Sequence, residues 1–289
     1  MAPQLCLGTV QFGLPYGVTN DSGQVRELEV RSILSLAAQA GIQLLDTAQV
    51  YGSSETVLGR CWPLAAPRRL ISKLLPMTEP KTWELSFQVS LRRLATSSLD
   101  AFLLHRSADL TGSNGDLLLT WLESLRSRGL VKRIGVSIYD ASELDALPLD
   151  RLQLVQLPLS LYDQRFLKDG TIDDLCRAGL EIHARSTFLQ GLLLQDPERW
   201  PRFLSSPFQD HHRKLKNYLR KYQLTLLDAA IGFSRSCEAL EAVLVGVLSV
   251  EEMREVLQAW QKPFPAEFGS LFEWAWENAA DLDPRFWPT

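Results

Sequence analysis

Residues 41–52 read GIQLLDTAQVYG and hold the pattern that decides the fold. Gly41 follows the amphipathic stretch Val25–Ala40, and a glycine at that place is typical of a helix end. The short apolar run Gln43–Leu45 comes next and predicts a buried strand, and the polar residue Asp46 follows it directly. These residues therefore predict a helix, then a strand, then a polar loop.

The same order recurs along the whole chain. The strand pattern returns in the short apolar runs Leu5–Val10, Leu70–Ser72, Ala101–Leu104, Ile134–Val136, Leu152–Gln156, Leu180–Ala184 and Ala242–Val247. Helical patterns lie between the runs, for example at Trp83–Leu94, Leu117–Arg128 and Val250–Trp260. Eight strand-then-helix units predict the α/β class and a single closed (β/α)8 TIM barrel that spans residues 1–289 as one domain.

Two segments depart from this rhythm. Residues 195–222 separate the seventh strand from its expected helix at Thr225–Arg235, so we expect an inserted loop with a helix of its own. Apolar residues interleave the basic run His211–Arg220 at helical spacing, which indicates the solvent-facing side of that helix. The tail at about 263–289 is rich in aromatic residues, namely Phe264, Phe268, Phe272, Trp274, Trp276, Phe286 and Trp287. This tail either packs across the barrel or lines a substrate pocket.

The composition sets further limits on function. The chain has 289 residues, of which 46% are hydrophobic and 22% charged, and its net charge of −4 gives no general reason to bind nucleic acid or anionic lipid. No run approaches roughly 18 apolar residues and the N-terminus lacks a signal-peptide pattern, so we expect no membrane partner and a cytoplasmic location. The cysteines and histidines lack metal-ligand spacing, so we expect no metal and reduced, mostly structural cysteines.

Polar residues follow the apolar runs at the strand ends where active sites of such barrels lie. In strand order these residues are Asp46, Lys73, His105, Ser137, Gln156 and Arg185. A carboxylate, an amine and an imidazole at three successive strand ends are unexpected by chance, and Tyr51 follows on the loop after Asp46. Because the loops after the strands converge at one end of a barrel, these side chains are predicted to form one site.

The chemistry of four of these side chains suits the protonation of a carbonyl oxygen. A buried ammonium beside a phenol favours phenolate, so we expect Lys73 to lower the pKa of Tyr51 and make it a proton donor near neutral pH. Asp46 would keep Lys73 charged, and His105 would hydrogen-bond the reacting oxygen or relay a proton. Taken singly, the residues are also consistent with a structural ion pair, a rim histidine and a packed tyrosine.

The sequence resembles the aldo-keto reductase family over nearly its whole length. The matching segments are LGTVQFG at 7–13, GIQLLDTAQVYG at 41–52, SE at 54–55, LG at 58–59, ISK at 71–73, LLH at 103–105 and GLVKRIGVS at 129–137. The resemblance implies a catalytic tetrad of Asp46, Tyr51, Lys73 and His105. In that family the tyrosine is the general acid during hydride transfer between a nicotinamide cofactor and an aldehyde or ketone. A small-molecule carbonyl or alcohol substrate is therefore expected.

The resemblance also implies the cofactor contacts Gly8, Thr9, Asp46, Ser137, Gln156, Arg185, Ser186, Phe188, Leu189, Gln190, Gly246, Ser249, Glu252 and Glu255. Among these, backbone groups near Phe188–Gln190 and the helix start at Ser249 suit phosphate. Ile138 replaces an asparagine that usually holds the nicotinamide carboxamide. Arg185 replaces a tyrosine that stacks on the nicotinamide ring, and we expect it to contact the cofactor or an anionic substrate group, or to pair with a neighbouring loop.

The third departure concerns the choice of cofactor. Glu252 replaces an arginine that commonly binds the 2′-phosphate of NADP in the family, and a carboxylate would repel that phosphate while accepting a hydrogen bond from a ribose hydroxyl. Arg254 lies two positions away, where a small shift of register would restore a basic contact. On the habit of the family, NADPH is slightly favoured over NADH.

Three functions compete at this point. The leading one is an NAD(P)H-dependent oxidoreductase that reduces an aldehyde or ketone, or oxidises the corresponding alcohol, by direct hydride transfer. The second is a dinucleotide-binding sensor or regulatory protein with little turnover, which the three departures from the family pattern keep open and which the complete tetrad disfavours. The third is a Schiff-base lyase with Lys73 as nucleophile, which Asp46 disfavours because it keeps the amine charged.

Overall fold

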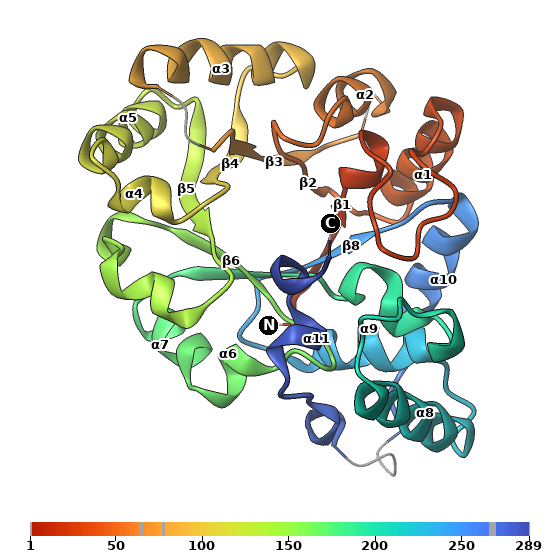
Figure 1. Cartoon of the computed structure of the whole chain (residues 1–289). Coiled ribbons are helices and arrows are strands. Elements are labelled where there is room, and N and C mark those ends of the chain that lie inside the picture. The colour runs from red at the N-terminus through yellow and green to blue at the C-terminus, as the bar shows by residue number, and fades with distance from the viewer. Residues whose placement is uncertain (1, 64–65, 77–78, 266–269, 289) are drawn as a thin grey trace.

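The computed structural model describes residues 2–63, 66–76, 79–265 and 270–288. Its centre is a closed barrel in which parallel strands follow one another in sequence order and the first pairs with the last (Figure 1). The strands are β1 (Gln4–Gly8), β2 (Leu44–Asp46), β3 (Arg69–Leu74), β4 (Leu99–Leu104), β5 (Val131–Ser137), β6 (Leu154–Pro158), β7 (Glu181–Arg185) and β8 (Ala242–Gly246). The predicted (β/α)8 barrel is confirmed.

Helices surround the strands on the outside of the barrel (Figure 1). They are α1 (Glu27–Gln39), α2 (Ser54–Cys61), α3 (Pro80–Arg93), α4 (Ala108–Thr111), α5 (Gly115–Ser127), α6 (Arg165–Lys168), α7 (Thr171–Arg177), α8 (Ser206–Arg220), α9 (Leu226–Ser236) and α10 (Val250–Gln261). A further helix, α11 (Ala279–Leu282), belongs to the C-terminal tail and is drawn over the barrel end in Figure 1. The helical patterns of the sequence correspond to α1, α3, α5, α9 and α10. Within the described ranges, no helix has the length and apolar character needed to cross a membrane.

Several strand boundaries differ from the predicted ones by a few residues, and those of β1 and β3 affect the strand ends most relevant to the site. Strand β1 ends at Gly8, and Val10 begins a 3₁₀ turn, because the backbone N–H and the hydroxyl of Thr9 both turn toward the carbonyl of Asp46. Strand β3 runs on to Leu74, so Lys73 lies within the strand and not beyond its end. There it pairs with Leu103 of β4. Lys73 is thus part of the rigid barrel wall.

The connection between β7 and α9 carries helix α8, and the interpretation of its basic run is wrong in part. Lys214 and Arg220 are exposed as expected, but His212 is fully buried and its Nδ1 lies 2.7 Å from the hydroxyl oxygen of Tyr162. The four-residue spacing from Phe208 places His212 on the apolar side of α8, where both rings pack against Tyr162.

The described part of the C-terminal tail packs across the molecule and does not line the main cavity. Trp276 stacks on Phe208 of α8 with ring centroids 5.3 Å apart, and its backbone N–H donates to the Tyr162 carbonyl. Farther along, the Arg285 guanidinium carbon lies 4.5 Å from the ring centroid of Tyr139, after β5. In Figure 1 this dark-blue segment runs from beside α8 toward the barrel mouth. The aromatic Phe268 lies outside the described residues.

His183 of β7 is a buried histidine with no hydrogen-bond partner for either ring nitrogen among the described residues. Burial, and next the positive charges of Arg133 and Arg69, lower the pKa of His183 to about 3. In an unfolded chain a histidine titrates near pH 6.5. The unfolded state therefore takes up this proton first as the pH falls, and folding stability is lost between the two values.

We expect His183→Leu to make the protein less sensitive to acid. Stability from the wild-type residue is fully present above about pH 6.5 and declines by ~1.4 kcal/mol per pH unit as the pH falls toward about 3. Urea unfolding at several pH values between about 7 and 4 measures this slope. In His183→Leu the free energy of unfolding should change less with pH, by up to about 1.4 kcal/mol per pH unit, because unfolding then takes up about one proton fewer. An unchanged slope would show that His183 is not buried in its neutral form.

Candidate active site

One cavity of about 360 Å³ opens where the strands end. Of the residues predicted from the sequence, its lining includes Gly8, Thr9, Asp46, Tyr51, Lys73, His105, Ser137, Gln156, Arg185, Ser186, Phe188, Gln190, Gly246, Glu252 and Glu255. Leu189 is buried away from the cavity, and the Ser249 hydroxyl caps α10 by accepting from the Glu252 N–H at 3.1 Å. The described residues contain no group of three metal-ligating side chains.

The loop that carries Tyr51 is held against the end of β1. Thr9 and Ser54 bind each other through their hydroxyls at 2.8 Å, and the Ser54 hydroxyl lies 2.7 Å from the Thr9 carbonyl. Gly13 faces this loop so closely that a Cβ there would lie 1.8 Å from the Tyr51 carbonyl oxygen. Only a residue without a side chain permits this contact, so GLPYG at 13–17 and the Tyr51 loop fit together as one unit.

Lys73 and Asp46 form a buried ion pair at the floor of the cavity. The Lys73 Nζ donates to Asp46 Oδ1 at 2.5 Å and to the Thr47 carbonyl at 3.1 Å, and both charged side chains are at most 3% exposed. The Gln156 amide donates to the other carboxylate oxygen at 2.9 Å. Each oxygen of Asp46 thus has a donor, and the Lys73 ammonium is held in one orientation.

Tyr51 and His105 face the cavity next to this pair. Their rings meet edge to face with centroids 5.9 Å apart, and the Lys73 Nζ lies 5.3 Å from the Tyr51 ring centroid. Within the described chain, neither the Tyr51 hydroxyl nor the His105 ring makes a hydrogen bond. Both groups are therefore available to a ligand that enters the cavity.

The expected lowering of the Tyr51 pKa is wrong. Burial, and then the Asp46 carboxylate, raise the pKa of Tyr51 well above its ordinary value, and the Arg185 charge opposes them only in part. The expectation from the sequence considered only the positive charge of Lys73. Because Asp46 lies against Lys73, its negative charge offsets the charge of the ammonium. Burial, with the charges of Lys73 and Arg185, lowers the pKa of His105 to about 4. At neutral pH the site therefore holds a protonated phenol and an uncharged imidazole.

Arg185 extends from the end of β7 toward the end of β5. Its guanidinium donates to the Ser137 hydroxyl at 3.3 Å and to the Ile138 carbonyl at 2.8 Å, and its carbon lies 3.9 Å from the Tyr139 ring centroid. It forms no ion pair with the described loops, so the structure does not support that interpretation. The Ile138 side chain is fully buried and contributes only its backbone to this cluster.

Two carboxylates accept hydrogen bonds from backbone N–H groups at the start of α10. Glu252 accepts from the Leu248 N–H at 2.7 Å, and Glu29 of α1 accepts from the Val250 N–H at 2.6 Å. Burial raises the pKa of Glu252. The helix start at Ser249, which the sequence suggested as a phosphate site, is thus already capped by acidic side chains.

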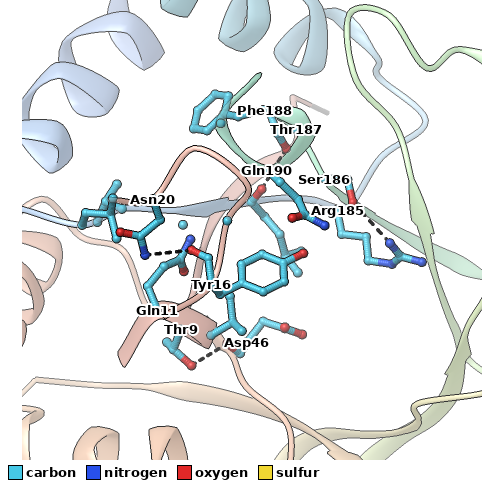
Figure 2. A pocket seen from close by; sticks show the side chains of 18 of the residues that line it. Thr9, Gln11, Tyr16, Asn20, Asp46, Arg185, Ser186, Thr187, Phe188 and Gln190 are labelled. Carbon is cyan, nitrogen blue, oxygen red and sulfur yellow. Dashed lines mark hydrogen bonds between the residues drawn. The ribbon is translucent and has the colours of Figure 1, made fainter. Parts of the chain in front are cut away.

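The sequence interpretation missed the loop between β1 and α1. Tyr16 on this loop projects into the cavity (Figure 2), and the Thr19 hydroxyl donates to the Gln190 carbonyl at 3.2 Å. Asn20 holds the loop by donating to the Tyr16 carbonyl at 3.0 Å (Figure 2). The loop thereby bridges to the segment after β7. An aromatic residue between two glycines, in the loop after the first strand, was the available signal.

The residues present fit a nicotinamide group. The Oε1 atom of Gln156 is buried and has no hydrogen-bond partner among the described residues, while its amide nitrogen is committed to Asp46. An unsatisfied buried acceptor at the cavity floor suits an amide donor of a ligand, such as a carboxamide NH2. Ser137 adds a hydroxyl on the neighbouring strand, in register with Gln156.

The fold and this cavity define the chain as a (β/α)8-barrel protein with a pocket, lined by polar and apolar residues, at the carboxyl ends of its strands. Residues 4–276 match the family model described as the Aldo/keto reductase family, so the chain belongs to this family. This finding confirms the resemblance seen in the sequence.

Individual relatives agree with this assignment. An aldo-keto reductase from Mycolicibacterium vanbaalenii is 33% identical over 132 residues, which are 43% of this chain and 45% of that protein. The uncharacterized oxidoreductase YqkF of Bacillus subtilis is 23% identical over 252 residues, 79% of this chain and 81% of that protein. The match spans about half the length of the first curated relatives, 45% and 49%.

A solved structure shows the same fold. The aldo-keto reductase AKR11C1 from Bacillus halodurans, in its holo form, superposes with a TM-score of 0.73 at 21% sequence identity, covering 94% of this chain and 91% of that one. At this level of identity the likeness concerns the barrel, and the function has to be argued from the residues of the site.

Proposed function

We propose that this protein is an NAD(P)H-dependent oxidoreductase that reduces an aldehyde or ketone, or oxidises the corresponding alcohol, with Tyr51 as general acid. One observation carries the proposal. An unbonded phenol and an unbonded imidazole face the cavity directly beside a buried Lys73–Asp46 ion pair. Family membership supports the same class of reaction.

The proposed roles of the side chains follow from their surroundings. The Tyr51 hydroxyl donates its proton to the carbonyl oxygen of the substrate, and the uncharged His105 hydrogen-bonds the same oxygen. The Lys73 ammonium stabilises negative charge that develops on this oxygen and on the phenol. Because Lys73 already donates to Asp46 and to the Thr47 carbonyl, its amine is not presented as a nucleophile, which argues against a Schiff-base lyase.

A nicotinamide cofactor, when bound, would supply or accept the hydride. We assign its carboxamide to Gln156 and Ser137, and the rest of the dinucleotide to Gly8, Thr9, Gly246 and the loop 186–190. Backbone at glycine positions permits close approach of a ligand. The loop from Tyr16 to Asn20, which bridges to Gln190, would cover the bound cofactor.

We further propose that the cofactor is NADH in preference to NADPH. Glu252 and Glu255 line the cavity beside α10, and Glu29 covers the Val250 N–H there. These carboxylates support discrimination against a 2′-phosphate, because like charges repel and the backbone donors are already used. This proposal departs from the slight preference for NADPH that the family pattern led us to expect.

Glu252→Arg should shift the preference toward NADPH. Exchanging a carboxylate for a guanidinium at the cavity edge removes a repulsion and adds a phosphate ligand, so we expect the ratio of the dissociation constants for NADPH and NADH to fall about tenfold or more. Fluorescence titration with both cofactors measures this ratio. Glu251→Arg is the matched control. This substitution makes the same charge change on the same helix, but Glu251 does not line the cavity. Equal effects of the two variants would contradict a local role of Glu252.

The proposed function is tested by titrating the purified protein with NADH and NADPH and then following absorbance at the reduced-nicotinamide band with a panel of aldehydes. Binding followed by turnover would support the oxidoreductase. Binding without turnover of any aldehyde or ketone would favour a sensor. A folded protein that binds neither cofactor would refute the proposal.

A further inference from the structure

The cavity contains a cation without a counter-charge. Arg185 is half-buried and lines the cavity, and its acceptors are the Ser137 hydroxyl, the Ser186 hydroxyl and the Ile138 carbonyl, at 3.3, 3.2 and 2.8 Å. All three are neutral. No carboxylate of the described chain forms an ion pair with Arg185. A partly buried, unpaired charge is costly to a protein, so its retention in a cavity calls for a ligand that pairs with it.

The other charges at this end of the cavity are compensated. Lys73 is paired with Asp46 at 2.5 Å, and Arg285, which approaches from the tail, is paired with Asp283 at 2.6 Å. The lining carboxylates Glu252 and Glu255 belong to α10 after β8, whereas the Arg185 guanidinium reaches the end of β5. Arg185 therefore leaves one positive charge uncompensated in the cavity that Tyr51 and His105 also line.

The guanidinium is also held in a fixed orientation. Its carbon lies 3.9 Å from the Tyr139 ring centroid, and the carbon of Arg285 lies 4.5 Å from the same centroid. A guanidinium has five N–H groups, and the three acceptors use one each on Nε, Nη1 and Nη2. One N–H on each terminal nitrogen has no acceptor in the described part of the chain. These two N–H groups can donate to the oxygens of a carboxylate.

We propose that the substrate of this enzyme is an oxo acid, an aldehyde or ketone that also carries a carboxylate, and that Arg185 binds the carboxylate while the carbonyl group lies at Tyr51. This inference rests on the proposed carbonyl reduction and adds the class of substrate. The positive charge of Arg185 acts on both groups assigned to the carbonyl oxygen, since it contributes to lowering the pKa of His105 and opposes the raised pKa of Tyr51. The cation therefore lies within electrostatic reach of the reacting carbonyl.

A binding experiment tests the carboxylate site without any reaction. Benzoate and benzamide are the probes, because they have the same shape and differ in charge. With the NADH-loaded protein, calorimetry should show benzoate binding at least about tenfold more tightly than benzamide. In Arg185→Leu the two should bind alike. Arg285→Gln is the matched control, because it removes a cation that stacks on the same ring but does not line the cavity, and it should keep the preference. No preference in the wild type, or a preference that survives Arg185→Leu, overturns the proposal.

A kinetic experiment then links the site to turnover. Two substrate pairs, 4-carboxybenzaldehyde with benzaldehyde and succinic semialdehyde with butanal, differ in each case by a carboxylate. For at least one pair the wild-type kcat/KM should favour the acid by about tenfold or more, mainly through KM, and in Arg185→Leu the ratio should approach one. Arg185→Lys should keep part of the preference, because a lysine supplies the charge without the planar fork.

The outcomes separate this inference from the proposed function. If no carbonyl compound is reduced while benzoate binding still depends on Arg185, the proposed reaction fails and the anion site stands. If aldehydes are reduced with no preference for acids, the reaction stands and the substrate class is refuted. If Arg185→Leu weakens NADH binding and leaves the ratio of acid to neutral substrate unchanged, Arg185 is a cofactor contact and the inference is refuted.

Discussion

Tyr51→Phe should lower carbonyl reduction by roughly 10²–10⁴-fold while cofactor binding stays within a few-fold of the wild type. The variant keeps the aromatic ring that meets His105 edge to face and removes only the hydroxyl, which has no hydrogen-bond partner in the described structure. The loss should therefore fall on proton donation and not on the fold. Steady-state kinetics with the best aldehyde, together with a fluorescence titration of NADH, measures the two effects separately.

Tyr16→Phe is the control for this variant, because it removes the same oxygen from another tyrosine that lines the same cavity. It should cost far less activity than Tyr51→Phe. Because burial raises the pKa of Tyr51, the phenol remains protonated at high pH, and kcat/KM for reduction should not decline through loss of this proton below about pH 10. Comparable losses in the two variants would contradict the assignment of Tyr51 as proton donor.

Lys73→Met should destabilise the protein as well as inactivate it. The ammonium is 2.5 Å from Asp46, and the two side chains are 1% and 3% exposed. Removing one partner of a buried pair leaves the other charge unpaired, and the usual cost is about 3–5 kcal/mol of the free energy of unfolding. Urea unfolding measures this loss, and the aldehyde assay measures the accompanying loss of turnover.

The double variant Asp46→Asn with Lys73→Met separates the two effects. It leaves no unpaired charge, so it should regain a large part of the stability while activity stays lost, and the double-mutant cycle gives the coupling energy. A Lys73→Met protein as stable as the wild type would show that the carboxylate finds another partner, such as the Gln156 amide that already donates to it. That result would contradict the expectation that the Lys73–Asp46 ion pair stabilises the fold.

The sequence predicted the barrel and the residues at its mouth because both depend on short-range patterns. Each apolar run becomes a strand, and the parallel arrangement then brings the ends of all strands to one side. Asp46, Ser137 and Arg185 are the last residues of their strands, and His105 directly follows β4. Their convergence follows from topology alone, without knowledge of any side-chain contact.

Features that depend on distant contacts could not be predicted in this way. The carboxylate of Glu29 reaches the Val250 N–H across 221 positions of the chain, and Arg285 reaches Asp140 across 145. The direction of the Tyr51 pKa shift also depended on burial and on the charge of Asp46 in its final position. Local patterns carry no information on such pairings, so the carboxylates at the start of α10 and the environment of Tyr139 become visible only in the fold.

The pairing of β1 with β8 has a consequence for synthesis on the ribosome. Gly8 lies beside Gly246 in the closed barrel, so β1 can pair with β8 only after residue 246 has been synthesised. Until then the edges of β1 and of the growing sheet are open to wrong partners, including other nascent chains. Chains that end before β8 should therefore accumulate as aggregates or be degraded, and they cannot persist as smaller folded proteins.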